Sequence, residues 1–270
     1  MNWLLISIPT ATVAALAGTW SPCGLSMLST FTPIREAAHG RRFAVTAAWF
    51  ILGAVLGGAA LGSLSAVGAI SLAALRLDPS VRAMAVSALF LLGAAWDAGW
   101  LRPALPHHRR QVNETWLRQF RRWFTASGFG VQIGFGLATY IMTTGVYLTI
   151  LTGVASARPA VAALTGVWFG AVRGMVVLST AKVTTSADLI AIHQRLEQLR
   201  SPVRRAVAVL LLSFGAVIAA ATLGVDERFG ILALGTAGLA AAAWTLRWHG
   251  RAVAKGIGRG ARLTDADQFA

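Results

Sequence analysis

The chain has 270 residues, of which 56% are hydrophobic and 13% are charged, and its mean hydropathy is +0.64. About a quarter of the residues of a soluble domain are charged, so this composition excludes an ordinary soluble domain and requires lipid to cover much of the surface. The net charge of +14 does not indicate nucleic-acid binding, because the basic residues stand in short runs between apolar segments. We expect a protein that contacts the lipid bilayer and no nucleic acid.

Seven apolar segments are long enough to cross a membrane, since about 20 helical residues span about 30 Å of hydrocarbon. No alternating strand pattern occurs, and backbone groups in lipid must pair internally, so the predicted fold is all-α. The segments are residues 3–33, 43–70, 81–101, 128–156, 160–180, 204–224 and 229–247.

The distribution of Lys and Arg predicts the orientation. With the N-terminus outside, 19 of these residues fall in cytoplasmic segments and 4 in outer segments. Such an excess is typical of the cytoplasmic side. We therefore expect a multi-pass protein of the bacterial inner (cytoplasmic) membrane with a cytoplasmic C-terminus. Two cytoplasmic segments, 113–124 and 188–199, have the pattern of amphipathic helices that lie in the membrane interface.

Short motifs recur in the two halves of the chain. Gly-Ala-Val-Leu-Gly at 53–57 and Gly-Ala-Val-Arg-Gly at 170–174 match at an offset of 117 residues. The third segment contains a Val-Arg pair followed later by Gly-Ala, and the sixth segment contains the same two pairs at an offset of 122 residues. Three crossings in each half would invert one half relative to the other, as in many transporters. We predict two inverted three-helix repeats plus one C-terminal helix.

The predicted organisation has five parts. They are a first repeat at 1–101, a basic amphipathic cytoplasmic linker at 102–127, a second repeat at 128–224, a seventh transmembrane helix at 225–248 and a basic cytoplasmic tail at 249–270.

The first segment of each half is longer than the bilayer requires and is interrupted. Pro22 lacks a backbone N–H and pushes against the preceding turn, which predicts a helix break at Ser21, Pro22 and Gly24. The segment 128–156 is rich in glycine. Long, interrupted helices at matching positions point to a working site near the midplane. The 117-residue offset maps Cys23 onto Tyr140.

The sequence Gly-Thr-Trp-Ser-Pro-Cys-Gly at 18–24 resembles the first-helix motif of the DsbD/CcdA family of membrane thiol–disulfide carriers. It is also similar to a divergent branch of that family, the methylamine-utilisation proteins MauF. The resemblance implies an assistant of thiol redox or of cytochrome c and quinoprotein maturation. A thioredoxin-like or periplasmic redox protein would be the partner, and Cys23 would be the candidate catalytic thiol.

The chain departs from the DsbD/CcdA pattern at the counterpart of Cys23. That position is Tyr140, and Cys23 is the only cysteine. An internal disulfide is therefore impossible, and the predicted enzyme class stays open between a redox carrier and a protein without catalysis. Cys23 is either a thiol activated by the start of a helix or a small residue packed in the bundle.

Six further polar residues are candidates for the site. Thr139, Tyr140, Thr143 and Thr144 in the fourth segment either line a substrate path or bond to neighbouring backbone. Asp97 and Arg173 are the charged residues furthest inside the segments, at similar depth. Charges in lipid tend to be paired, so we expect an intramembrane ion pair, the alternative being that each extends toward the interface.

Three classes of function remain open. The first is the CcdA-like maturation role, the second is a secondary transporter of a small solute or ion, and the third is a membrane partner that holds another protein in place. The five His residues lie in loops or at segment ends without Cys or acidic residues at metal-ligand spacing, so we expect no metal site and no cofactor. No hydrolase or ATPase motif occurs.

Overall fold

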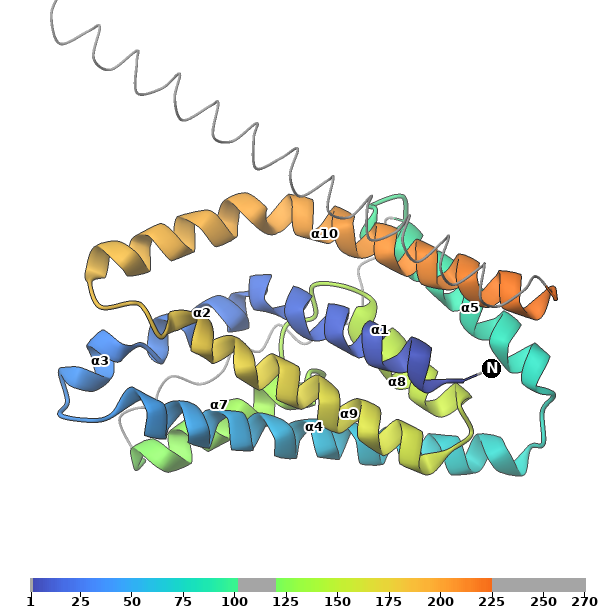
Figure 1. The fold of residues 1–270 in the computed structure, drawn as a ribbon, viewed down its shortest axis with the longest axis horizontal. Helices are drawn as coiled ribbons and strands as arrows, with labels where there is room; N and C mark the ends of the chain where they lie inside the picture. The colour runs from blue at the N-terminus through green and yellow to red at the C-terminus, as the bar shows by residue number, and fades with distance from the viewer. Residues whose placement is uncertain (1, 102–119, 225–270) are drawn as a thin grey trace, which may run out of the picture.

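A computed structural model describes residues 2–101 and 120–224, and this part of the chain is helical without strands. The elements run back and forth along the long axis of the molecule (Figure 1). They are α1 (Leu4–Ala17), η1 (Gly18–Trp20), α2 (Pro22–Thr30), α3 (Pro33–Ala37), α4 (Phe43–Ala74), α5 (Pro79–Asp97), α7 (Arg122–Phe135), α8 (Gly145–Ala155), α9 (Pro159–Met175), η2 (Val176–Thr180) and α10 (Ser186–Thr222).

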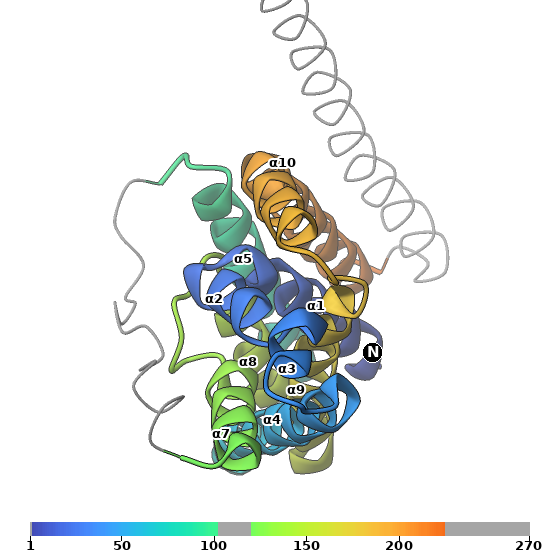
Figure 2. The ribbon, with the colours of Figure 1, turned by 90° about the vertical axis from the view of Figure 1, so that its left-hand side faces the viewer.

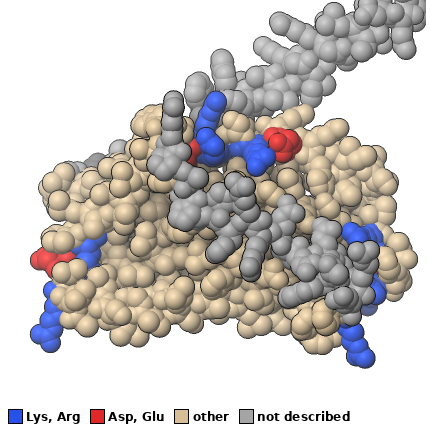
Figure 3. All heavy atoms as spheres, turned by 180° about the vertical axis from the view of Figure 1, so that it is seen from behind, with Lys and Arg blue, Asp and Glu red and all other residues tan. Residues whose placement is uncertain are grey.

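Four of these helical stretches are long and apolar enough to cross a membrane, namely α4, α5, α9 with η2, and α10. The pair formed by α1 with η1 and α2 makes a fifth if its 71° bend lies within one crossing. Figure 3 shows a broad band of uncharged side chains, with Lys and Arg near the two ends of this face and along its upper edge. An all-helical membrane protein is therefore supported. The predicted seventh crossing at 229–247 lies outside the described residues.

Helix α4 lies between α9 and α7 and packs extensively on both (Figure 2). Glycine permits the close approach to α9, since a Cβ at Gly58 or Gly166 would overlap backbone atoms of the opposite helix. Gly130 and Gly134 of α7 meet the backbone of α4 in the same way. Small residues allow such contact between membrane helices, where van der Waals packing drives association.

Helices α5 and α10 form a second packed pair. The Ser87 hydroxyl of α5 donates a hydrogen bond of 2.8 Å to the Gly215 carbonyl oxygen of α10. The two helices that share the Gly-Ala-Val motif, α4 and α9, thus pack on each other. The two that share the Val-Arg and Gly-Ala pairs, α5 and α10, do the same. An inverted repeat predicts this pairing, and the repeat itself stays a prediction.

Two predicted boundaries differ from the structure. Residues 188–199 and 204–224 are not separate segments, because α10 runs through both and includes Pro202. Its capping box, in which Thr185 and Asp188 each accept from the other's backbone, starts this helix at Ser186. Helix α7 begins at Arg122, inside the predicted linker. Residues 102–119 of that linker and most of the predicted amphipathic segment 113–124 lie outside the described residues, as do the predicted seventh helix and tail.

Candidate functional site

The first helix is interrupted at the predicted residues. Helix α1 gives way to the single turn η1, and Ser21 leaves helical geometry with ψ at 155°. The Ser21 hydroxyl accepts a 3.1 Å hydrogen bond from the Gly24 N–H and donates one of 2.7 Å to the Gly18 carbonyl. Pro22 stands at the first position of α2, where no N–H is needed. The sequence therefore starts a new helix here and turns the chain by 71°.

The second interruption separates α7 from α8 and covers residues 136–144, which are not helical. Gly136 has φ of 72°, a conformation that suits glycine, and it ends α7. Thr139, Thr143 and Thr144 are buried within this segment, and Tyr140 is half-buried. Irregular backbone at membrane depth is tolerated only where protein or a water-filled cavity surrounds it, so this segment belongs to the interior of the bundle.

Arg173 of α9 is the residue that contacts both interruptions. Its Nη2 lies 3.5 Å from the Thr139 hydroxyl in the second, within the limit for a weak hydrogen bond. In the first, the guanidinium occupies the space that a side chain at Gly18 would take. The guanidinium also lies over the Phe169 ring, with 5.7 Å from Cζ to the ring centre. The two interrupted helices therefore meet around one buried cation.

The guanidinium of Arg173 is not saturated with hydrogen bonds. The side chain is 3% exposed, and Nε and Nη1 have no partner among the described residues. A pocket of about 10 Å³ adjoins it, roughly the space that one water molecule requires. Its lining residues are Gly18, Thr19, Gly24, Met27, Ile133, Arg173 and Val176. Two donor nitrogen atoms are thus without an acceptor at this point.

Cys23 is the second residue of α2, directly after the bend, and is 2% exposed. It lies close enough to Arg173 for the charged forms of the two side chains to interact. The sole thiol therefore lies within electrostatic range of the buried cation. A partner protein cannot reach the thiol in this conformation, because the side chain is covered.

The Asp97–Arg173 ion pair expected from the sequence is not formed. The Asp97 carboxylate, 3% exposed, accepts two 3.1 Å hydrogen bonds from the Thr144 N–H and one of 3.0 Å from the Thr144 hydroxyl. Thr144 directly precedes the first residue of α8. A negative charge at the N-terminus of a helix accepts from a free backbone N–H and interacts favourably with the helix dipole. Asp97 therefore caps α8 from the end of α5, and it also interacts electrostatically with Arg204.

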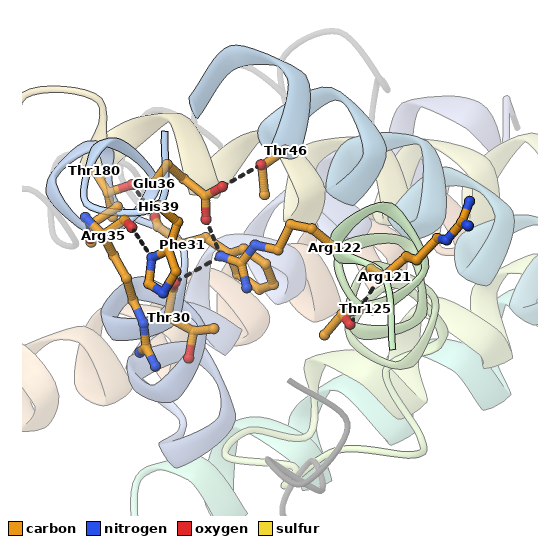
Figure 4. Close-up of polar contacts among 11 residues, drawn as sticks. Thr30, Phe31, Arg35, Glu36, His39, Thr46, Arg121, Arg122, Thr125 and Thr180 are labelled. Carbon is orange, nitrogen blue, oxygen red and sulfur yellow. Dashed lines mark hydrogen bonds and ion pairs between the residues drawn. The ribbon is translucent and has the colours of Figure 1, made fainter. Parts of the chain in front are cut away.

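A second buried charge cluster was not predicted. Glu36 of α3, 2% exposed, forms an ion pair with Arg122 of α7 and accepts a 2.8 Å hydrogen bond from the Thr46 hydroxyl of α4 (Figure 4). Arg122 also donates to the Thr30 carbonyl at 3.1 Å and lies 4.6 Å above the Phe31 ring. One signal in the sequence was available, since Glu36 is the only acidic residue among the first 77.

The described residues contain no group of three or more His, Cys, Asp or Glu side chains arranged to hold a metal ion. The polar groups at the interruptions are one thiol, one guanidinium, several hydroxyl groups and the Asp97 carboxylate that accepts from Thr144.

Comparison with known proteins finds relatives but no matching family model and no matching solved structure. The chain is 32% identical over 174 residues to "Methylamine utilization protein MauF" of Methylorubrum extorquens, covering 60% of this chain and 57% of the relative. It is 28% identical to MauF of Paracoccus versutus, over 55% of this chain and 56% of that protein. It is 30% identical to MauF of Paracoccus denitrificans, over 53% and 52%.

The chain thus spans about half the length of the curated relatives that it matches. These relatives support the MauF part of the expected resemblance. They give no support to the DsbD/CcdA part, which was inferred from a short motif around Cys23.

Proposed function

We propose that this chain is an integral inner-membrane protein of methylamine utilisation, which assists the maturation of a quinoprotein or c-type cytochrome on the outer face of the membrane. The observation that carries the proposal is the similarity, at 28–33% identity, to five proteins named for methylamine utilisation. The apolar helices agree with a membrane location. The proposed orientation has the N-terminus outside, in line with the distribution of Lys and Arg.

Within this proposal, the working site is the meeting point of the two interruptions. Arg173 supplies two unpaired donor nitrogen atoms there, which suit an anionic or carbonyl oxygen of a ligand. A role for the Cys23 thiol requires a second sulfur from a partner, because the chain has no other cysteine. In such a step the Cys23 thiolate would attack a partner disulfide, forming a mixed disulfide and releasing the partner's other sulfur as a thiolate. Since Cys23 is buried, this step also requires the helix pair to open.

Growth on methylamine tests the proposal. We expect deletion of the gene in its host to abolish growth with methylamine as the carbon source and to leave growth on succinate unchanged. We expect the wild-type gene and an Arg158→Met control, which alters an exposed arginine, to restore growth. Normal growth of the deletion strain on methylamine would contradict the proposal.

Two variants examine the site itself. Arg173→Met should fail to restore growth although the protein accumulates in the membrane, because the two free donors are lost. Its thermal unfolding temperature should equal or exceed that of the wild type, since each buried, unpaired polar group costs about 1–3 kcal/mol. Cys23→Ala separates the thiol step from the rest, because full growth with this variant would exclude thiol chemistry and leave the maturation role intact.

A secondary transporter is the alternative, and the partly unpaired guanidinium of Arg173 favours it. Transporters bind anionic substrate groups at interrupted helices near the midplane, and a cation at such a place would add to the binding of an anion. Counterflow of small carboxylates into proteoliposomes, measured with the wild type and with Arg173→Met, would support this function if only the wild type accelerates exchange. Exchange no faster than in protein-free liposomes across the series would count against it.

A further inference from the structure

A pocket with a mainly apolar lining, to which arginines contribute, lies away from the interruptions, at the end of the molecule where α4 and α7 begin. Its volume is about 240 Å³. Three arginines, Arg41, Arg42 and Arg122, contribute to its lining together with the indole rings of Trp49 and Trp123. The two rings are 5.7 Å apart between centres and come from different helices. The pocket is therefore built jointly by two elements that are far apart in the sequence.

The positive charge of this pocket exceeds the negative charge near it. Glu36 pairs with Arg122, but no acidic side chain of the described chain lies within ion-pair distance of Arg41 or Arg42. Arg41 and Arg35 lie close enough to Arg122 for their charges to repel it. The Nε of Arg122 is also buried without a hydrogen-bond partner. This end of the molecule thus gathers like charges that an added anion would stabilise.

The surroundings of the pocket are those of a membrane interface. Trp49 and Trp123 are 39% and 48% exposed, and Phe120 and Phe124 are exposed beside them. Aromatic side chains collect at the level of lipid headgroups. Beyond Trp49 the exposed side of α4 is apolar and carries Leu52 and Leu56, a surface that acyl chains can cover.

We infer that this pocket binds the phosphate group of an anionic phospholipid. The phosphate binds the exposed Arg41 and Arg42, which have no acidic partner among the described residues, and the apolar lining of the pocket suits the rest of the lipid. The glycerol region contacts the two indole rings, and the acyl chains follow α4. A free phosphate shares the charge but not the apolar part, and that difference allows an experiment to separate the two sources.

Lipid-dependent thermal stability tests this inference on the full chain in detergent. Cys23 is the only cysteine and is 2% exposed, so a dye that fluoresces on reaction with thiols reports unfolding. We expect phosphatidylglycerol to raise the unfolding temperature and phosphatidylcholine or millimolar inorganic phosphate to leave it unchanged. Arg41→Gln/Arg42→Gln should need about 30-fold more phosphatidylglycerol for the half-maximal effect, since each basic residue near a lipid surface contributes roughly a factor of five.

The matched control is Arg76→Gln/Arg158→Gln, which removes two exposed arginines distant in sequence from the pocket. This control should respond to phosphatidylglycerol like the wild type. Trp49→Leu/Trp123→Leu should weaken the response to the lipid, whereas Trp100→Leu, at a tryptophan that is 79% exposed, should not. An unchanged response of the Arg41/Arg42 variant would overturn the inference. An equal effect of phosphatidylcholine, or saturation by inorganic phosphate alone, would overturn the assignment to an anionic lipid.

Discussion

The ion pair between Glu36 and Arg122 should be a main source of stability at the end of the molecule where α3, α4 and α7 meet. The test is Glu36→Gln, which keeps the size of the side chain and an oxygen that can accept from the Thr46 hydroxyl. Only the charge is lost. Arg122 then remains as a largely buried cation whose remaining contacts are the Thr30 carbonyl and the Phe31 ring.

The expected size follows from the burial of the pair. Removing one partner of a buried ion pair costs about 3–5 kcal/mol. Arg122 is 15% exposed and keeps other contacts, so we expect the lower end, about 3 kcal/mol. For a chain of this size each kcal/mol corresponds to roughly 2–4 °C, and the unfolding temperature should fall by about 6–12 °C. The assay is thermal unfolding in detergent, followed by the reaction of Cys23 with a fluorogenic maleimide.

An exposed pair on α10 provides the control. Glu197 and Arg200 lie one helical turn apart at 3.5 Å, with side chains 62% and 42% exposed. Glu197→Gln should change the stability by less than about 0.5 kcal/mol, since exposed pairs contribute little. In addition, Glu36→Gln combined with Arg122→Met should lose less than the sum of the single losses, with a coupling of roughly 1–3 kcal/mol. Additive losses, or equal effects of the Glu36 and Glu197 variants, would refute the reasoning.

Three further predictions concern packing, burial and helix capping. Gly166→Leu should prevent the contact of α9 with α4 and reduce the folded yield several-fold on size-exclusion chromatography, whereas Ala60→Leu on the exposed side of α4 should not. Cys23 in sealed vesicles should not react with an impermeant maleimide from either face and should react in SDS; fast labelling of the native protein would contradict its burial. Asp97→Asn should lower the free energy of unfolding by about 1.5–3 kcal/mol, because Thr144 loses a charged hydrogen-bond acceptor. Amide hydrogen exchange should increase in the first turn of α8. Unchanged exchange in that turn would argue against the cap.

The first interruption could be predicted from the sequence because its causes are local. Pro22 cannot donate a backbone hydrogen bond, and Ser21 is a good residue to start a helix, so both requirements stand next to each other in the chain. The second interruption has no proline. Its glycines indicated an irregular helix, but the contacts that the non-helical residues 136–144 make with Arg173 and Asp97 join residues that are distant in sequence.

The pairing of charged residues could not be predicted from depth alone. Asp97 and Arg173 have similar expected depth, but α5 packs mainly on α10 while α9 packs mainly on α4. Depth along a helix gives no information on which neighbour each side chain faces. The Glu36–Arg122 pair was missed for the same reason, since its partners are 86 residues apart and meet only when α3 and α7 are folded against α4.

Arg173 combines three properties that packing does not explain. It is buried at the meeting point of both interruptions, it has two unpaired nitrogen atoms, and it occupies the space that a side chain at position 18 would take. A charged side chain in a membrane is costly, and an apolar residue of similar size would fill the space without that cost. The glycine and the irregular backbone at Thr139 therefore fit a site arranged around the cation, which is the reason to look for the ligand or partner at Arg173 before Cys23.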